Sequence, residues 1–327
     1  MATVTGSNGR DNLNGTELVD QIFGRGGNDT LIGFGGDDTL EGGAGADELF
    51  GSTGFDYASY KSSPTSVIVS LQGFYAANGD AEGDHLYSIE GLIGSRFNDA
   101  LFGDDQRNVL RGGGGVDDLY GLEGNDRLEG GAGTDNLEGG AGADELLGGD
   151  GVDTASYANS LEAVRVDLAN GKGFGGDAEG DRLSGIENAL GSLYDDFIFG
   201  NNGANALQGF RGADNFIGGG GADRFVYLSA DDSSAFGTPT PDIISDFSHA
   251  QGDRIDLRGV DANEQVDGNQ AFRFIGQNEF TATGQVRFFH EDGATFVEAN
   301  TTDTHPGADM LIKVESLLSL QAGDFLL

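Results

Sequence analysis

Apolar and polar positions follow a nine-residue period over much of the chain. From Gly6 the units read GSNGRDNLN, GTELVDQIF, GRGGNDTLI, GFGGDDTLE, GGAGADELF and GSTGFDYAS. Position 1 is glycine, position 6 is aspartate, and position 8 is leucine or isoleucine until the last unit. Side chains alternate along a strand, so the position-8 side chain is expected to face inward from a three-residue strand such as 145–147. The glycines before it permit a tight turn, and two units are expected to make one coil.

The nine-residue period resumes from Gly94 and from Gly191, and the sequence also contains a longer repeat. Residues 54–119 resemble residues 151–216, and GDAEGD recurs at 79–84 and 176–181. Between the runs, alternating apolar residues such as those at 67–71 predict strands, so the interruptions are expected to be ordered, wider coils. We therefore expect an all-β protein: a parallel β-roll solenoid in three runs with β-rich inserts. The expected parts are runs at 1–56, 94–156 and 191–228, inserts at 57–93 and 157–190, and a C-terminal β-domain at 229–327.

Composition points to cations as partners. The 327 residues carry 55 acids against 17 bases, a net charge of -38, which repels nucleic acid and anionic membrane surfaces. The 59 glycines and the acidity alone would suggest disorder, but a linker would not keep the nine-residue phase. The absence of cysteine excludes disulfides and thiolate metal sites. We expect no membrane span and, from the start of the sequence, no cleaved secretory signal, which alone would indicate the cytoplasm.

The stacked aspartates explain the need for a cation. Units 18 residues apart should stack, placing Asp29 over Asp47 and Asp117 over Asp135. Close carboxylates cannot all ionise without a counter-charge, and Ca²⁺ accepts several oxygens in a loose geometry. Mg²⁺ demands a stricter octahedron, and no histidine or cysteine recurs for Zn²⁺. We expect several Ca²⁺ ions, with roughly eleven possible sites from pairing units. The candidate carboxylates are Asp11, Asp29, Asp38, Asp47, Asp56, Asp99, Asp117, Asp126, Asp135, Asp144, Asp153, Asp196, Asp214 and Asp223.

Calcium would also have to stabilise the fold. One leucine per strand contributes about 1.5–3 kcal/mol when buried. Ordering the backbone of a nine-residue unit costs about 1–2 kcal/mol for each residue, which exceeds the contribution of one leucine. Metal binding therefore becomes folding free energy, and the chain is expected to fold only with calcium.

The units resemble the hemolysin-type RTX nonapeptide G-G-x-G-x-D-x-U-x. That resemblance implies a β-roll in which each ion takes the aspartate and the position-2 and position-4 carbonyls of one turn. From the turn 18 residues later it takes the aspartate and the position-1 and position-3 carbonyls. One implied site uses Arg25, Gly27 and Asp29 with Gly42, Ala44 and Asp47; another uses Gly131, Gly133 and Asp135 with Gly148, Asp150 and Asp153. Further implied carbonyl ligands are Gly36, Gly115, Gly124, Gly130, Ala132, Gly139, Ala141, Gly218 and Gly220.

Some units depart from this pattern. Leu18, Phe97 and Tyr194 replace glycine at position 4, and Asn108 and Asn205 replace aspartate. We therefore expect sites at the starts of the runs to be weak or empty.

The last hundred residues resemble the C-terminal domain of serralysin-type peptidases, and the chain ends SLQAGDFLL. An acid followed by three apolar residues resembles the terminal signal of type I secretion substrates. This resemblance implies export by the type I secretion machinery and folding in the extracellular space. Asp242, Asp246, Asp253 and Asp256 form either a further cation site or a solvated strand face, and the solvated face is favoured.

No catalytic constellation is found, so we expect a protein that is not an enzyme. HEDGA at 290–294 lacks the second histidine of H-E-x-x-H, and no G-x-S-x-G occurs. The acids Asp80, Glu82, Asp84 and their counterparts Asp177, Glu179, Asp181 are interpreted as loop calcium ligands or solvated turns rather than general acids.

The leading interpretation is a secreted, non-catalytic calcium-binding RTX protein. One alternative is a calcium-dependent module that binds extracellular polysaccharide through the outward aromatics Phe23, Phe50, Phe102, Tyr120 and Phe199, although covering of these rings is favoured. Another alternative is a secreted signalling or pore-forming protein.

Overall fold

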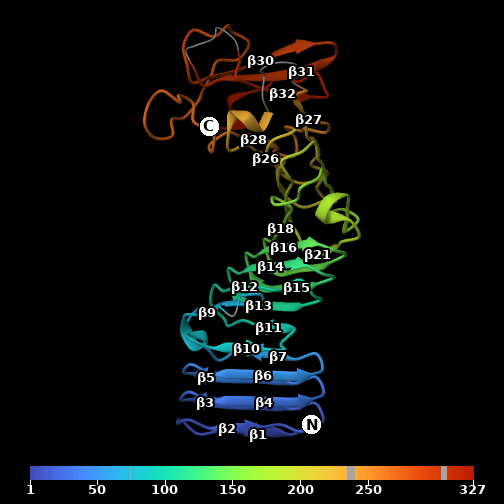
Figure 1. The fold of residues 1–327 in the computed structure, drawn as a ribbon. Helices are drawn as coiled ribbons and strands as arrows, with labels where there is room; N and C mark the ends of the chain where they lie inside the picture. The colour runs from blue at the N-terminus through green and yellow to red at the C-terminus, as the bar shows by residue number, and fades with distance from the viewer. Residues whose placement is uncertain (74, 234–239, 303–307) are drawn as a thin grey trace. The chain divides into compact units, whose positions relative to one another are not determined.

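A computed structural model describes residues 1–73, 75–233, 240–302 and 308–327 (Figure 1). Over these residues the chain forms β-strands, short 3₁₀ turns and loops, without an α-helix. The described chain accordingly contains no helix of the length and hydropathy needed to cross a membrane. Two compact units are present: residues 1–155 with 180–186, and residues 156–179 with 187–327.

The first unit is a roll whose chain visits two faces alternately. One face is a continuous parallel sheet of β1 (Thr3–Thr5), β3 (Gln21–Gly26), β5 (Thr39–Ala44), β7 (Tyr57–Ser59), β11 (Gly91–Ile93), β13 (Val109–Gly115), β15 (Arg127–Gly133), β17 (Glu145–Gly151) and β21 (Arg182–Ser184). On the other face β2 (Asn12–Asn14), β4 (Thr30–Gly35), β6 (Glu48–Thr53) and β10 (His85–Tyr87) form one parallel group. A second group there comprises β8 (Ile68–Ser70), β12 (Ala100–Phe102), β14 (Asp118–Glu123), β16 (Asn136–Ala141) and β18 (Thr154–Ser156).

The position-8 leucines build the core of this roll. Leu110 lies opposite Leu128, and Leu128 lies opposite Leu146, in the parallel register of neighbouring strands. All three side chains are 0% exposed. Partners in this register are 18 residues apart, which confirms that two nine-residue units make one coil. Stacked strands of this kind are seen at β3 and β5 and at β4 and β6 in Figure 1.

The segment 57–93 leaves the roll and returns to it. After β7 the chain forms the antiparallel pair β8 and β9 (Tyr75–Ala77) and the 3₁₀ turn η1 (Gly79–Ala81). It then adds β10 to β6 and β11 to β7. The residues of this insert therefore supply rungs to both faces of the roll.

The second unit continues the same parallel pattern and ends in an antiparallel meander. One sheet contains β19 (Arg165–Asp167), β20 (Lys172–Phe174), β23 (Phe197–Phe199), β25 (Asn215–Ile217), β27 (Asp242–Ile244), β32 (Met310–Val314), β31 (Ala294–Asn300), β30 (Gln285–Glu291) and β29 (Arg273–Phe274). The other contains β22 (Asn188–Leu190), β24 (Ala206–Gln208), β26 (Arg224–Val226), β28 (Arg254–Asp256) and β33 (Phe325–Leu326). The described part of this unit also contains three 3₁₀ turns: η2 (Gly176–Ala178), η3 (Ala230–Ser233) and η4 (Ala322–Asp324).

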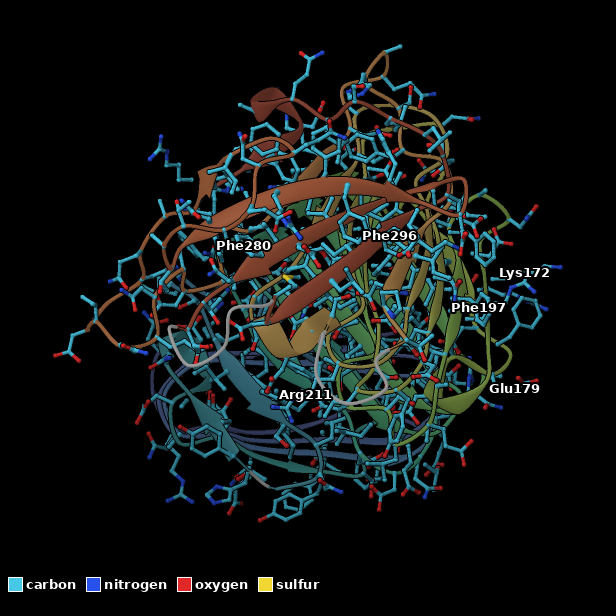
Figure 2. All side chains as sticks on the ribbon, turned by 90° about the horizontal axis from the view of Figure 1, so that it is seen from above. Lys172, Glu179, Phe197, Arg211, Phe280 and Phe296 are labelled. Carbon is cyan, nitrogen blue, oxygen red and sulfur yellow. The ribbon has the colours of Figure 1, made fainter. Side chains whose placement is uncertain are left out.

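Aromatic side chains enlarge the core of the second unit. Phe216 and Phe225 are 1% and 0% exposed, and their ring centroids lie 5.9 Å apart. The outer surface instead carries both charged and aromatic side chains. Lys172, Glu179 and Phe197 lie on it, and Phe197 is 48% exposed (Figure 2). Together the two units confirm the predicted all-β fold with parallel coils.

Candidate calcium sites in the roll

The position-6 aspartates of stacked coils are joined into ladders. The amide of Asp29 donates to Oδ1 of Asp47 at 2.7 Å. The same amide-to-Oδ1 bond joins the pairs Asp38–Asp56, Asp117–Asp135, Asp126–Asp144 and Asp135–Asp153. In every pair the acceptor follows the donor by 18 residues. The structure thus stacks these aspartates as the repeat predicted, and the stacking occupies one oxygen of each carboxylate.

In several of the ladder aspartates, the other carboxylate oxygen has no hydrogen-bond donor. Among the described residues, Oδ2 is buried without such a partner in Asp29, Asp38, Asp47, Asp56, Asp117, Asp126, Asp135, Asp214 and Asp223. A buried acceptor left unsatisfied costs about 1–3 kcal/mol, and a charged one costs more. The repeated orphan oxygens are therefore places where a cation would stabilise the roll.

Glycine at position 1 opens a cradle beside each orphan oxygen. A Cβ built on Gly130 would lie 2.5 Å from Oδ2 of Asp135 and 2.7 Å from the carbonyl oxygen of Gly148. No real side chain tolerates such contacts, so only glycine fits there. The carboxylate of one coil and the carbonyl of the next coil consequently face the same space.

Carbonyl oxygens of the Asp135 coil face the glycines of the next coil. A Cβ on Gly149 would collide with the carbonyl oxygen of Gly131, and a Cβ on Gly151 would collide with that of Gly133. Gly151 has φ of 147°, a conformation that favours glycine. The carbonyl oxygens of Gly131 and Gly133 therefore face the next coil, and that of Gly148 lies near Oδ2 of Asp135. Their binding of an ion stays a prediction.

The same cradle recurs at neighbouring turns. Carbonyl oxygens that meet a glycine of the next coil are those of Arg25, Gly27, Gly36, Gly113, Gly115, Leu122, Gly124, Gly131 and Gly133. Carbonyl oxygens that lie with Oδ2 of the previous coil include those of Gly42, Gly51, Gly130, Gly139 and Gly148, and the carbonyls of Gly24 and Gly112 lie likewise at the run starts. Of these, Gly24, Gly51, Gly112, Gly113 and Leu122 were not among the predicted ligands.

The position-3 residues have a further role. The carbonyl of Ala44 accepts the amide of Gly27 at 2.8 Å, and that of Ala141 accepts the amide of Gly124 at 3.0 Å. These bonds tie successive coils together beside the cradles. Ala132 and Asp150 stand opposite each other in the register of β15 and β17.

Burial raises the pKa of the inner carboxyls. Desolvation is the largest effect, and together with nearby carboxylates it raises the pKa of Asp47 and Asp56 to about 6 and that of Asp117 and Asp126 to about 7. Their amide hydrogen bonds act in the opposite direction but do not cancel the desolvation. The carboxylates thus lack the charge compensation that a bound cation would supply.

The first turns of the runs are built differently. At the predicted ligands Asp11, Asp99 and Asp196, the amide of a serine four residues earlier donates to Oδ2, at 2.6, 2.5 and 2.5 Å. The serine hydroxyl adds a second bond. The side-chain oxygens of Asn108 and Asn205 likewise accept an amide from four residues earlier, at 2.7 and 2.8 Å. These bonds give a reason for expecting weak or empty sites there, which stays a prediction.

Two aspartates of the inserts belong to the ladders. The amide of Asp47 donates to Oδ1 of Asp84, and the amide of Asp144 donates to Oδ1 of Asp181, both at 2.8 Å and across 37 residues. Asp84 and Asp181 are each 2% exposed, so a solvated turn is wrong for them. The tyrosine hydroxyl of Tyr60 donates to Oδ2 of Asp84 at 3.2 Å. A signal was present, because GDAEGDHLY at 79–87 and GDAEGDRLS at 176–184 keep glycine at position 1, aspartate at 6 and leucine at 8.

The ladders of the second unit extend into the C-terminal segment. The amides of Asn205 and Asp196 donate to Oδ1 of Asp223 and Asp214. The backbone amides of Asp214 and Asp223 in turn donate to Oδ1 of Asp242 and Asp253, at 2.9 and 3.0 Å.

The four C-terminal acids therefore do not form one site. Asp242 and Asp253 are 1% and 2% exposed, so a solvated strand face is wrong for them. Asp246 accepts the amides of Gly218 and Gly219, each at 2.8 Å. Asp256 forms an ion pair with Arg258 at 2.6 Å. At the predicted turn 218–220, the carbonyl oxygen of Gly218 lies near Oδ1 of Asn205, and the amide of Gly220 donates to the carbonyl oxygen of Asn201 at 2.8 Å.

The donor set suits a hard cation. No cluster of three or more His, Cys, Asp or Glu side chains that could hold a metal occurs within the described ranges. The cradles instead combine carboxylates with backbone carbonyls, and such all-oxygen sets are what Ca²⁺ takes in proteins. The residues present therefore fit calcium.

The outward aromatics mostly contact neighbouring side chains. Phe50 stacks on Tyr87 and Phe102 stacks on Tyr120, with ring centroids 4.5 and 4.8 Å apart. The Arg165 guanidinium lies 4.8 Å from the ring centroid of Phe199. Phe23 is the exception among the five rings, because it borders an open hollow.

Comparison with known families agrees with this geometry. Residues 70–327 match the family described as Peptidase M10 serralysin C terminal. Residues 5–38, 14–49 and 23–58 match the RTX calcium-binding nonapeptide repeat (4 copies). Neither match is to a peptidase catalytic domain, and a search of curated proteins finds no match. The chain belongs to the serralysin C-terminal family of the M10 peptidases and carries RTX calcium-binding repeats.

Proposed function

We propose that this chain is a secreted calcium-binding protein that folds outside the cell when Ca²⁺ fills the cradles of its roll. The observation that carries the proposal is the series of buried, donor-free Oδ2 atoms facing glycine cradles lined by carbonyl oxygens. Without a cation, these carboxylates and a net charge of -38 oppose compaction. Binding of a cation to the folded roll alone shifts the equilibrium toward the fold.

The cradle between the Asp29 and Asp47 coils illustrates the proposed ligands. Asp29 and Asp47 would contribute carboxylate oxygens, and Arg25, Gly27 and Gly42 would contribute carbonyl oxygens. The bound ion would neutralise the buried carboxylates and link consecutive coils.

Matching cradles are proposed for other pairs of stacked aspartates: Asp38–Asp56, Asp117–Asp135, Asp126–Asp144 and Asp135–Asp153. We propose fewer ions than the roughly eleven pairs that repeat counting allows. The reason is that serine donors already satisfy the carboxylates at the starts of the runs.

Export and the lack of catalysis belong to the same proposal. Membership of the serralysin C-terminal family supports export by the type I secretion machinery and an extracellular location. The matches cover RTX repeats and this C-terminal domain and no catalytic peptidase domain, which supports a non-catalytic role. We also propose the division into runs at 1–56, 94–156 and 191–228, inserts at 57–93 and 157–190, and a C-terminal domain at 229–327.

A calcium titration of the full chain tests the proposal. Far-UV circular dichroism and light scattering should show an expanded, disordered chain in chelator and a cooperative gain of compact β-structure with Ca²⁺. Mg²⁺ at equal concentration should be a much weaker trigger, since it demands a stricter octahedral site. A chain that stays compact and β-rich at neutral pH and without osmolyte after exhaustive metal removal would refute calcium-dependent folding.

A further inference from the structure

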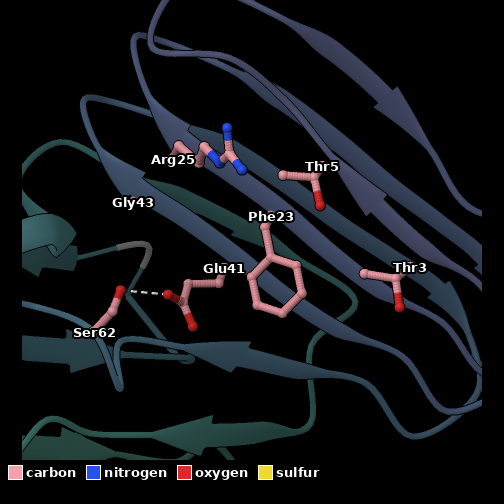
Figure 3. A pocket seen from close by; sticks show the side chains of 7 residues that line it. All are labelled: Thr3, Thr5, Phe23, Arg25, Glu41, Gly43 and Ser62. Carbon is pink, nitrogen blue, oxygen red and sulfur yellow. Dashed lines mark hydrogen bonds between the residues drawn. The ribbon is translucent and has the colours of Figure 1, made fainter.

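A hollow on the outer face of the first unit lies apart from the aspartate ladders. It has a volume of about 420 Å³ and opens over β1, β3 and β5 (Figure 3). Phe23, Arg25, Glu41, Thr5 and Ser62 are among the residues that line it. Gly43 forms part of the wall, and a Cβ there would collide with the carbonyl oxygen of Arg25. This volume is within the range of about 300–1,000 Å³ usual for small-molecule sites.

An acceptor and a donor of opposite charge face this hollow. Glu41 is held in place, because its carboxylate accepts the hydroxyls of Ser59 at 3.1 Å and of Ser62 (Figure 3). Arg25 is exposed, and neither Arg25 nor Glu41 takes part in an ion pair with another described residue. Each charge therefore retains unused hydrogen-bonding capacity toward the hollow.

These groups select a class of ligand. Glu41 and Arg25 carry opposite charges, so together they favour neither an anion nor a cation strongly. A hydroxyl group both donates and accepts, so neighbouring hydroxyls can satisfy the carboxylate and the guanidinium together. The half-buried ring of Phe23 offers an apolar surface between them.

We propose that this hollow binds a neutral sugar ring. One C–H face of the sugar lies on Phe23, its hydroxyl oxygens accept from Arg25, and its hydroxyl hydrogens are donated to Glu41. The proposal rests on the proposed function, because Arg25 sits on a calcium turn with φ of 78° and its carbonyl faces the coil of Gly43. Formation of that turn fixes the direction of the Arg25 side chain, so sugar binding requires the calcium-folded roll.

The test uses the full chain folded in calcium and a panel of neutral trisaccharides: cellotriose, maltotriose and mannotriose. Isothermal titration calorimetry should detect weak binding of at least one of them, and chelator should abolish it. Phe23→Ala should weaken that binding about tenfold or more through loss of the ring contact. Glu41→Gln should also weaken it, because the amide keeps the size of the side chain but not its charge-assisted bonds.

Two controls separate the sugar site from the fold. Both variants should keep the calcium midpoint of folding, since neither side chain enters a cradle. Phe50→Ala, which removes a ring stacked on Tyr87, should leave sugar binding unchanged.

A calcium-folded chain that binds none of the three trisaccharides, or binds them equally well in both variants, overturns the sugar site alone. Preference for an acidic trigalacturonate overturns the ligand class. Failure of calcium to fold the chain would instead refute the proposed function.

Discussion

Replacing Asp135 with asparagine isolates the role of the orphan carboxylate oxygen. In the folded roll, Oδ1 of Asp135 accepts the Asp117 amide at 2.9 Å, whereas Oδ2 is buried without a donor. Asparagine keeps an oxygen for the amide bond and nearly the same volume, but it removes the charge. Because Asp135 pairs with both Asp117 and Asp153, Asp135→Asn perturbs two proposed sites at once.

The expected effect has opposite signs with and without calcium. If each site has a dissociation constant on the order of 10⁻⁴–10⁻³ M, as in extracellular modules, about 10 mM Ca²⁺ stabilises the fold by about 1.4–2.7 kcal/mol per site. Loss of two sites should then cost about 3–5 kcal/mol and raise the calcium midpoint. In chelator the variant should instead favour the compact state, because desolvation raises the pKa of Asp135 and disfavours its charged form.

The assay is chemical denaturation of both proteins in calcium and in chelator, with an osmolyte added to populate the compact metal-free state. Asp99→Asn is the matched control. Its two oxygens accept the amides of Val67 and Ser95, and asparagine can keep only one of these bonds. The control should therefore lose similar stability in both conditions. Equal calcium-dependent losses in the two variants, or destabilisation of metal-free Asp135→Asn, would refute the role given to the orphan oxygen.

Three further perturbations test other parts of the fold. In chelator, compact β-structure followed by circular dichroism should decrease from about pH 5 to about pH 8. Burial raises the pKa of Asp117 and Asp126 to about 7, so the stability from their protonation is complete below the pKa of the unfolded chain and is lost as pH rises through about 7. A flat profile would contradict this. Leu128→Ala should cost about 2–5 kcal/mol in calcium denaturation curves because the side chain is fully buried, and a loss well below this would mean that leucines do not carry the core. Gly133→Ala should raise the calcium midpoint of folding more than Gly114→Ala. A Cβ on Gly133 collides with a carbonyl oxygen, whereas a Cβ on Gly114 meets its nearest atom at 3.8 Å. Equal midpoints would exclude the close approach of coils.

Part of the candidate site could be predicted because it follows from local periodicity. Glycine at position 1, aspartate at 6 and leucine at 8 place each side chain relative to its own strand, and strict spacing then stacks Asp29 over Asp47. Asp84 was not recognised as a member of the ladder, since 37 residues separate it from Asp47. Its unit keeps glycine at position 1, aspartate at position 6 and leucine at position 8. The residue types therefore indicated a ladder unit, but the 37-residue spacing did not match the 18-residue repeat.

The sequence by itself determined the coil, its inward leucines and the supply of oxygen donors. The tertiary structure decided which carboxylates keep a free oxygen. At Asp99 the amide of Ser95 turns toward the carboxylate, whereas at Asp117 no donor reaches Oδ2. The direction of an amide depends on the backbone torsions of each turn, and the return of an insert to its ladder depends on contacts between distant residues. Neither quantity is encoded in the repeat unit alone, because both arise only when neighbouring coils pack.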